Sequence, residues 1–123
     1  AALPMSAFVC DYDHNAPTPE YLAETHFRFY KTYRARRRET PIVFITRPDV
    51  EHDPYIAARA AIVRATFDRA KEEGDENVYF INGGEFFPET ERGNCTVDGC
   101  HPTDLGFYFM AKRVREVVEP LLK

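Results

Sequence analysis

Residues 41–46 read PIVFIT, and this short apolar run decides the fold of the chain. The four hydrophobic residues after the proline are strand formers, and no polar residue alternates with them, which indicates a strand buried on both faces. Two similar runs flank it along the sequence, SAFVCDY at residues 6–12 and NVYFIN at residues 77–82. Helices must cover both faces of such strands, so the sequence predicts an α/β protein with a parallel sheet.

A first helix is predicted between the first two runs. Thr18 is a suitable N-cap, and Pro19 occupies the first helical position. The helix should extend to about Arg38, and we expect its basic last turns to be exposed, where they suit the negative end of the helix dipole. We expect the aromatic residues of this helix to belong to the core; they are Tyr21, Phe27, Phe29, Tyr30 and Tyr33.

Two further helices follow the second and third runs. One begins near Asp53 and Pro54 and ends at Gly74, and the other begins after the N-cap Thr103. Each has an apolar face at helical spacing: Ile56, Ala60, Val63, Phe67 and Ala70 in one, and Phe107, Met110, Ala111, Val114, Val117, Val118 and Leu121 in the other. The predicted order is βαβαβ–loop–α, without repeats.

Composition narrows the class of protein. The 123 residues suit a single domain, with 44% hydrophobic and 29% charged residues and a net charge of −4. We therefore expect neither nucleic acid nor an anionic membrane as a partner, and no apolar run approaches the length of a membrane span. The odd number of cysteines argues against a disulfide framework, and pairing of Cys95 with Cys100 and the cellular compartment both stay open.

The polar residues of interest follow the predicted strands. The segments DYDHNAP, TRPDVEHD and GGEFFPETERGNCTVDGCHPTD come after the first, second and third runs. In parallel sheets the loops at the carboxyl ends of the strands gather at one edge, where ligands bind. We therefore predict a functional site at this edge.

Asp98 and His101 are the candidate reactive pair of that site. An aspartate that accepts a hydrogen bond from one ring nitrogen fixes the histidine tautomer, so the other nitrogen is available to take a proton from a nucleophile. An alternative interpretation is that both residues have only a local structural role, in which Asp98 turns the chain and His101 caps it.

The segment CTVDGCHPTDLGFYFMAKRV, residues 95–114, resembles the C-terminal catalytic block of the SGNH hydrolases, the GDSL-like esterase and lipase superfamily. The resemblance implies a flavodoxin-like three-layer α/β/α domain and a Ser-His-Asp triad in which His101 is the general base and acid and Asp98 orients it. It implies acyl transfer to serine followed by hydrolysis, without metal or organic cofactor. The block is similar to that of bacterial acylhydrolases, so the implied substrate is a small-molecule or carbohydrate ester, with carbohydrate deacetylation as the particular reaction.

The resemblance also assigns an oxyanion donor. FVCDYDHNAP lies where the family has a Gly-x-Asn-Asp-like segment, and Asn15 matches its asparagine. Asp13 stands where glycine is common and Ala16 where aspartate is common, so the match is partial. The alternative for Asn15 is an Asx turn before Pro17.

The nucleophilic serine of the family has no counterpart in this chain. Ser6, the only serine, should lie at the amino end of the first strand, about 20 Å from Asn15 beyond its carboxyl end. The residues favour two other chemistries less. One is a cysteine nucleophile at Cys100 or Cys95; the other is a zinc site from Cys95, Cys100, His101 and His14, whose spacing is not a usual ligand pattern.

We therefore expect residues 1–123 to be the C-terminal part of one SGNH hydrolase-like domain, with its nucleophile in a missing N-terminal half. The abrupt start at Ala1 supports this expectation. Without upstream strands the first strand has an unpaired edge, so the chain alone should be inactive and should aggregate, dimerise or need its missing half. His14, Arg47 and Asp49 are weaker candidates for substrate contact, and a solvated loop is the favoured alternative for Arg47 and Asp49. The rival prediction is a non-catalytic α/β binding or assembly module.

Overall fold

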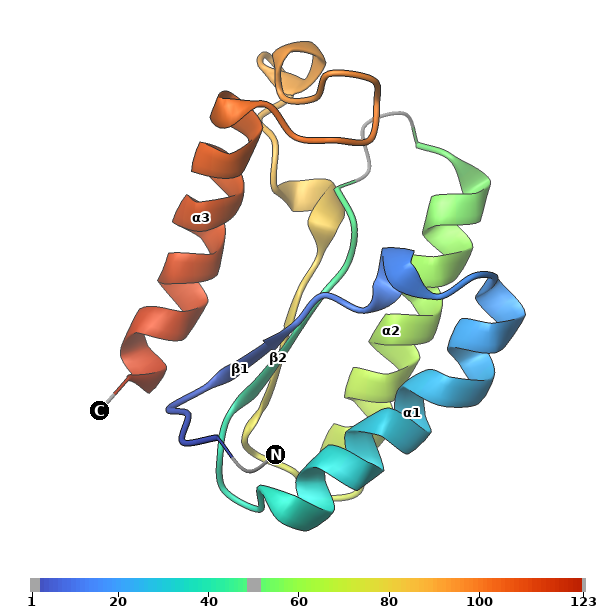
Figure 1. Cartoon of the computed structure of the whole chain (residues 1–123), viewed down its shortest axis with the longest axis vertical. Coiled ribbons are helices and arrows are strands. Elements are labelled where there is room, and N and C mark those ends of the chain that lie inside the picture. The colour runs from blue at the N-terminus through green and yellow to red at the C-terminus, as the bar shows by residue number, and fades with distance from the viewer. Residues whose placement is uncertain (1–2, 49–51, 123) are drawn as a thin grey trace.

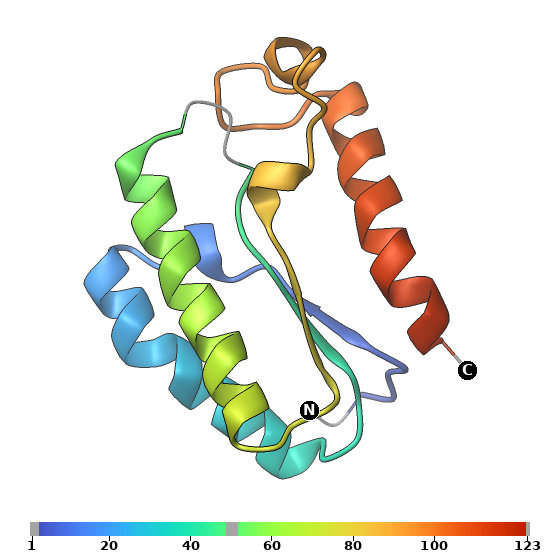
Figure 2. The same ribbon diagram turned by 180° about the vertical axis from the view of Figure 1, so that it is seen from behind.

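The computed structural model describes residues 3–48 and 52–122. Three parallel strands form one sheet in the order β1-β2-β3, where β1 is Phe8–Cys10, β2 is Ile42–Ile45 and β3 is Val78–Ile81. Helices α1 (Pro19–Arg36) and α2 (Pro54–Glu72) lie on one side of the sheet, and α3 (Asp104–Val118) lies on the other (Figures 1 and 2). The predicted three-layer α/β fold is therefore confirmed.

The central strand β2 is buried along its whole length, as its unbroken apolar sequence predicts. Ile42 and Phe44 pack into the core beneath α1 and α2, whereas Val43 and Ile45 pack into the core beneath α3. Because successive side chains point to opposite faces, one four-residue strand supplies both cores. The strands are shorter than the predicted runs, since the flanking residues enter the loops.

The helix caps follow the sequence signals. Thr18 caps α1 by accepting a hydrogen bond from the Tyr21 N–H, Asp53 caps α2, and Thr103 caps α3. The prediction that α1 reaches Arg38 is wrong by two residues, since α1 ends at Arg36. Within the described residues, no helix is both long and apolar enough to cross a bilayer.

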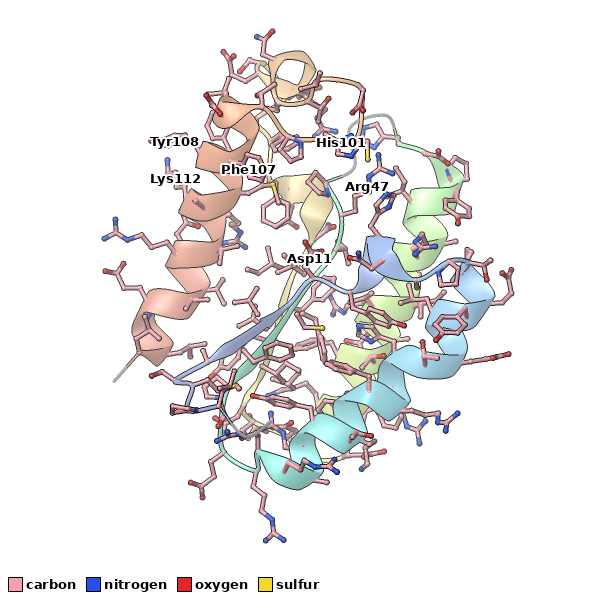
Figure 3. The ribbon with its side chains drawn as sticks, in the orientation of Figure 1. Asp11, Arg47, His101, Phe107, Tyr108 and Lys112 are labelled. Atoms are coloured by element: carbon pink, nitrogen blue, oxygen red, sulfur yellow. The ribbon has the colours of Figure 1, made fainter. Side chains whose placement is uncertain are left out.

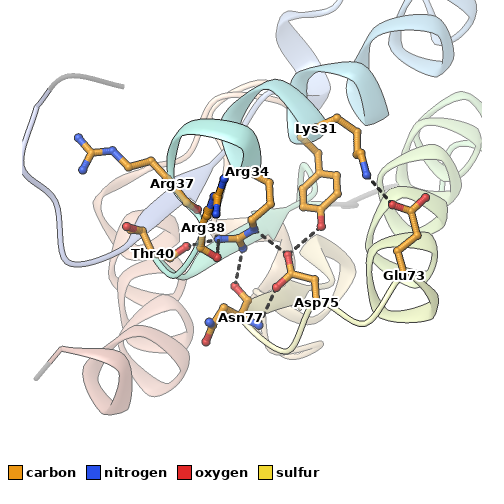
Figure 4. A network of polar contacts seen from close by, with 9 residues as sticks. Lys31, Arg34, Arg37, Arg38, Thr40, Glu73, Asp75 and Asn77 are labelled. Carbon is orange, nitrogen blue, oxygen red and sulfur yellow. Dashed lines mark hydrogen bonds and ion pairs between the residues drawn. The ribbon is translucent and has the colours of Figure 1, made fainter.

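Arg34 corrects the prediction of a simply exposed arginine run. Its guanidinium donates hydrogen bonds to the carbonyl oxygens of Arg37 and Thr40, at 2.6 and 2.8 Å, and to that of Asn77 at 3.2 Å. Its Nε also donates to Asp75 Oδ2 at 2.8 Å (Figure 4). Arg34 therefore ties the end of α1 to the segments that enter β2 and β3.

Three aromatic residues expected in the core are exposed instead: Tyr21 (46%), Phe29 (37%) and Phe107 (57%). On α3 most of the predicted face packs against the sheet, namely Met110, Val114, Val117, Val118 and Leu121, and Phe109 joins it. Ala111, predicted on this face, is exposed like Phe107. Phe107 lies on the side of α3 that borders the loops at the carboxyl edge of the sheet (Figure 3).

Candidate functional site

The loops after the three strands meet at one edge of the sheet, as predicted. A cavity of about 220 Å³ lies between them, lined by Asp11, His14, Asn15, Arg47, Pro48, Cys100, His101, Pro102, Phe107 and Met110. Figure 3 shows His101 and Arg47 at this end of the molecule, with Phe107 of α3 beside them. Of the predicted site residues, four line the cavity and Asp98 is hydrogen-bonded to one of them, His101.

Asp98 and His101 form a close pair. The His101 Nδ1 lies 2.7 Å from Asp98 Oδ2, and the Asp98 Oδ1 accepts the backbone N–H groups of Cys100 and His101 at 3.0 and 2.8 Å. Gly99 turns the chain between them with a φ of 77°, a conformation that favours glycine. A hydrogen bond from Nδ1–H to the carboxylate leaves the His101 Nε2 as the basic nitrogen. The side chains of His101 and Asp98 are 77% and 51% exposed.

The same contacts determine how Asp98 titrates. The His101 backbone N–H, the His101 ring and the Cys100 N–H lower the pKa of the Asp98 carboxyl from 3.8 to about 2. Because this pKa is lower in the folded than in the unfolded state, the contacts stabilise the folded chain above about pH 3.8. That contribution is lost as the pH falls through about 2.

We therefore predict a titration midpoint near 2 for the Asp98 carboxyl carbon, measured by NMR. In His101→Ala the midpoint should rise yet stay below 3.8, because two backbone N–H donors remain. His52→Ala, which changes a histidine of another loop, should leave the midpoint unchanged. A midpoint near 3.8 in the unsubstituted protein would contradict the geometry of the pair.

A buried ion pair holds the turn that presents His14 and Asn15. This turn is the 3-10 helix η1 (Asp13–Asn15), and the Asp13 side chain is 1% exposed. Its Oδ1 accepts a hydrogen bond from Arg59 Nε at 3.1 Å, and its Oδ2 accepts the Arg47 N–H at 2.9 Å. Arg59 also donates to the carbonyl oxygens of Asp13 and Ala16. The contacts fix η1 to both α2 and the end of β2.

Sequence reasoning missed the roles of Asp13 and Arg59. Asp13 stood out only as a departure from a family pattern, although it is the anchor of the turn. A signal for Arg59 was present, because it lies three residues after Ile56 and four before Val63, on the apolar face predicted for α2. A charged residue on such a face requires a buried partner.

Arg47 holds the loop that carries the reactive pair. Its Nη2 donates a hydrogen bond to the Gly99 carbonyl oxygen at 2.9 Å, at the centre of the turn between Asp98 and His101. Its own backbone N–H is bound by Asp13, so one residue connects the first and third loops. Asp49, which was predicted beside Arg47 as a substrate contact, lies outside the described residues.

Gly106 sets the distance between α3 and this loop. A Cβ at Gly106 would lie 2.1 Å from the Cys95 carbonyl oxygen, which itself accepts the Thr103 N–H at 2.9 Å. We predict that Gly106→Ala lowers the free energy of unfolding by about 1–3 kcal/mol, because backbone must move to admit the methyl group. Urea denaturation measures this loss. Gly93→Ala is the control, since its Cβ would meet nothing within 4 Å, and a loss of similar size there would refute the close contact.

The three cysteines differ in burial. All three are free, so the pairing of Cys95 with Cys100 that the sequence left open is absent. Cys10 and Cys95 are buried, and burial raises the pKa of the Cys10 thiol to about 12, which disfavours the reactive thiolate. Cys100 is half-buried beside the cavity. Ser6, the only serine, precedes β1 at the amino end of the sheet, away from these loops.

The chain is thus an α/β protein with a parallel sheet. A paired histidine and aspartate lie at the carboxyl ends of its strands, beside a small cavity. A sequence model of the GDSL-like lipase/acylhydrolase family matches residues 2–119. The chain belongs to the GDSL-like lipase/acylhydrolase family. The resemblance predicted from residues 95–114 is thereby confirmed. Comparison with curated proteins gives no match.

Solved structures have the same fold. One, assigned as a GDSL-like lipase from Bacteroides ovatus, is 26% identical with a TM-score of 0.80, and the match covers 98% of this chain and 37% of that protein. Another, the salicylyl-acyltransferase SsfX3 from a tetracycline biosynthetic pathway, is 18% identical with a TM-score of 0.75, covering 98% and 39% respectively. The chain therefore spans less than half the length of these structures.

Proposed function

We propose that this chain supplies the histidine and aspartate of a serine ester hydrolase whose serine lies outside residues 1–123. The observation that carries the proposal is the 2.7 Å contact between His101 Nδ1 and Asp98 Oδ2, at a cavity that His101 shares with Asn15. Membership of the GDSL-like lipase/acylhydrolase family supports acyl chemistry at this cavity.

In the proposed mechanism His101 moves the protons. Its Nε2 takes the proton of the serine hydroxyl as the serine oxygen attacks the ester carbonyl carbon, and the resulting imidazolium gives that proton to the departing alcohol. A water molecule then attacks the acyl-serine, again losing a proton to Nε2, and the serine regains its proton as the acid leaves. Asp98 stays ionised throughout and stabilises the imidazolium.

Asn15 is the proposed oxyanion donor. It lies on η1, whose position is fixed by the buried Asp13–Arg59 pair, and it lines the same cavity as His101. A preorganised amide N–H directed at the developing oxyanion is worth about 3–4 kcal/mol of transition-state stabilisation in comparable sites. The anchoring of η1 supports this role, because such donors act through fixed geometry.

The cavity supplies an apolar wall for the acyl group. Its volume between the described residues is about 220 Å³, and Phe107 and Met110 form the apolar side. An acetyl ester is the proposed substrate because the block 95–114 is similar to that of acylhydrolases that remove acetyl groups from carbohydrates. His14 and Arg47 add polar groups at the rim that suit a hydroxylated alcohol such as a carbohydrate, which makes carbohydrate deacetylation the proposed reaction.

The missing part of the domain is proposed to pair with β1. In the described residues β1 pairs only with β2, so its other edge has free N–H and C=O groups. Two apolar hollows border that edge, lined by residues that include Met5, Phe8 and the exposed Phe29. Upstream strands that add to β1 and cover these hollows would bring a serine to the cavity edge.

A fluorophosphonate, which labels only activated serines, tests the proposal. We expect one label per full-length protein by intact mass, on a serine outside residues 1–123, and no label in His101→Ala. The separate 123-residue chain should remain unlabelled. A full-length protein that takes no label would instead favour a non-catalytic binding or assembly module.

A further inference from the structure

Three metal-binding side chains converge beside the cavity. One donor atom from each of Asp98, Cys100 and His101 lies within 4.8 Å of the others. A fourth donor comes from η1, far away in the sequence, because His14 Nε2 lies 3.8 Å from Cys100 Sγ. Thiolate and imidazole are the ligands that Zn²⁺ prefers in proteins.

The contact between Cys100 and His14 has the dimension of a zinc site. With Zn–S and Zn–N bonds of about 2.3 and 2.0 Å and tetrahedral angles, two such ligands of one ion lie about 3.5 Å apart. The observed 3.8 Å needs only a small adjustment. We propose that Cys100, His14 and His101 bind a zinc ion over the reactive pair, and that this ion inhibits the enzyme.

Asp98 fits the outer sphere of this site. Its carboxylate already accepts two backbone N–H groups and the Nδ1–H of His101, so the Nε2 of His101 is left to bind the metal. A carboxylate behind a zinc-bound histidine is a recurrent arrangement that fixes the ring and strengthens the ligand. With three protein ligands, a water molecule takes the fourth position.

The backbone of the site is fixed while its ligands can adjust. Arg47 holds the Gly99 carbonyl next to Cys100, and the buried Asp13 holds the turn that carries His14. The side chain of His101 is 77% exposed, so a metal ion from solvent can reach its Nε2. This ligand set differs from the one considered on sequence alone, because Cys95 is fully buried in the core beneath α3.

The inhibitory effect rests on the proposed function, whereas metal binding does not. A His101 Nε2 that binds zinc has no lone pair for the serine proton, so acyl transfer stops until the metal leaves. The site therefore makes esterase activity sensitive to free zinc. This sensitivity is an added property, because the proposed ester hydrolysis itself uses no metal.

Cobalt titration of the untagged full-length protein tests binding apart from activity. Co²⁺ replaces Zn²⁺ and gives a thiolate-to-cobalt charge-transfer band when cysteine is a ligand. We expect this band at one equivalent, lost on addition of Zn²⁺, absent in Cys100→Ser and weakened at least about tenfold in affinity in His14→Gln. The control His52→Gln should behave as the unsubstituted protein. A missing band, or a band that persists in Cys100→Ser, would overturn the proposal.

Inhibition is then measured as the ratio of esterase rates with and without Zn²⁺ within each variant. The ratio should be low in the unsubstituted protein, restored by a chelator, and near one in Cys100→Ser. A Co²⁺ band without zinc inhibition would overturn the inhibitory role and leave the metal site standing. If no esterase activity is found at all, the proposed function fails, and the band still decides the metal site.

Discussion

Replacing His101 by alanine in the full-length protein should lower kcat for ester hydrolysis by about 10⁴-fold to 10⁶-fold, because the substitution removes the proposed general base and acid. The ring is held by Asp98 at 2.7 Å and borders the cavity, and its side chain is largely exposed, so the substitution removes chemistry with little cost in packing. Steady-state kinetics on a short-chain ester such as an acetyl ester gives the value.

Asp98→Asn is the companion variant and should lower kcat by about 10⁴-fold, since an amide favours the wrong histidine tautomer. Asp104→Asn is a matched control in the first turn of α3, exposed and not among the residues that line the cavity, and should retain activity within a few-fold. Near-normal kcat in both His101→Ala and Asp98→Asn would remove these two residues from the mechanism, and the serine label would then point to another base.

Arg59→Met should have the largest effect on stability, lowering the free energy of unfolding by about 3–5 kcal/mol. The substitution leaves the Asp13 carboxylate buried without its cation, and it also removes the donors to two carbonyl oxygens of the η1 turn. Urea denaturation measures the loss. Activity should fall as well, because the turn carries Asn15 and His14.

A control on the same helix separates this effect from the general cost of losing an arginine. Arg64 forms an exposed ion pair with Asp68, so Arg64→Met should cost less than about 1 kcal/mol. The double variant Asp13→Asn/Arg59→Met should be more stable than Arg59→Met alone, since it removes the unpaired charge. Equal losses in Arg59→Met and Arg64→Met would show that the buried pair contributes no more than a surface pair.

Much of the fold follows from local sequence. PIVFIT predicts a strand buried on both faces, and the structure places alternate residues of β2 in two separate cores. Caps at Thr18, Asp53 and Thr103 are visible in the sequence because a cap is a contact between near neighbours. Asp98 and His101 are equally local, three residues apart on one turn.

The parts that sequence reasoning missed depend on contacts between distant residues. Asp13 and Arg59 are 46 positions apart, and the packing of α2 against η1 brings them together. Arg34 interacts across a similar separation with Asp75 and Asn77. Phe107 was misplaced for another reason: α3 has apolar residues on more than one side, so periodicity does not decide which side faces the sheet.

Because of the polar network around Arg34, the two ends of the sheet differ in how well they tolerate substitutions and insertions. It holds the end of α1 and the segments entering β2 and β3 together at the edge opposite the cavity. Strand register is thus set where no substrate binds, and the loops after the strands can accept insertions or new side chains without sliding one strand past another. An engineer who wishes to change the ester that is recognised should diversify those loops around Asp13, Arg47, Asp98 and His101, and should leave these four residues, Arg34 and Asp75 unchanged.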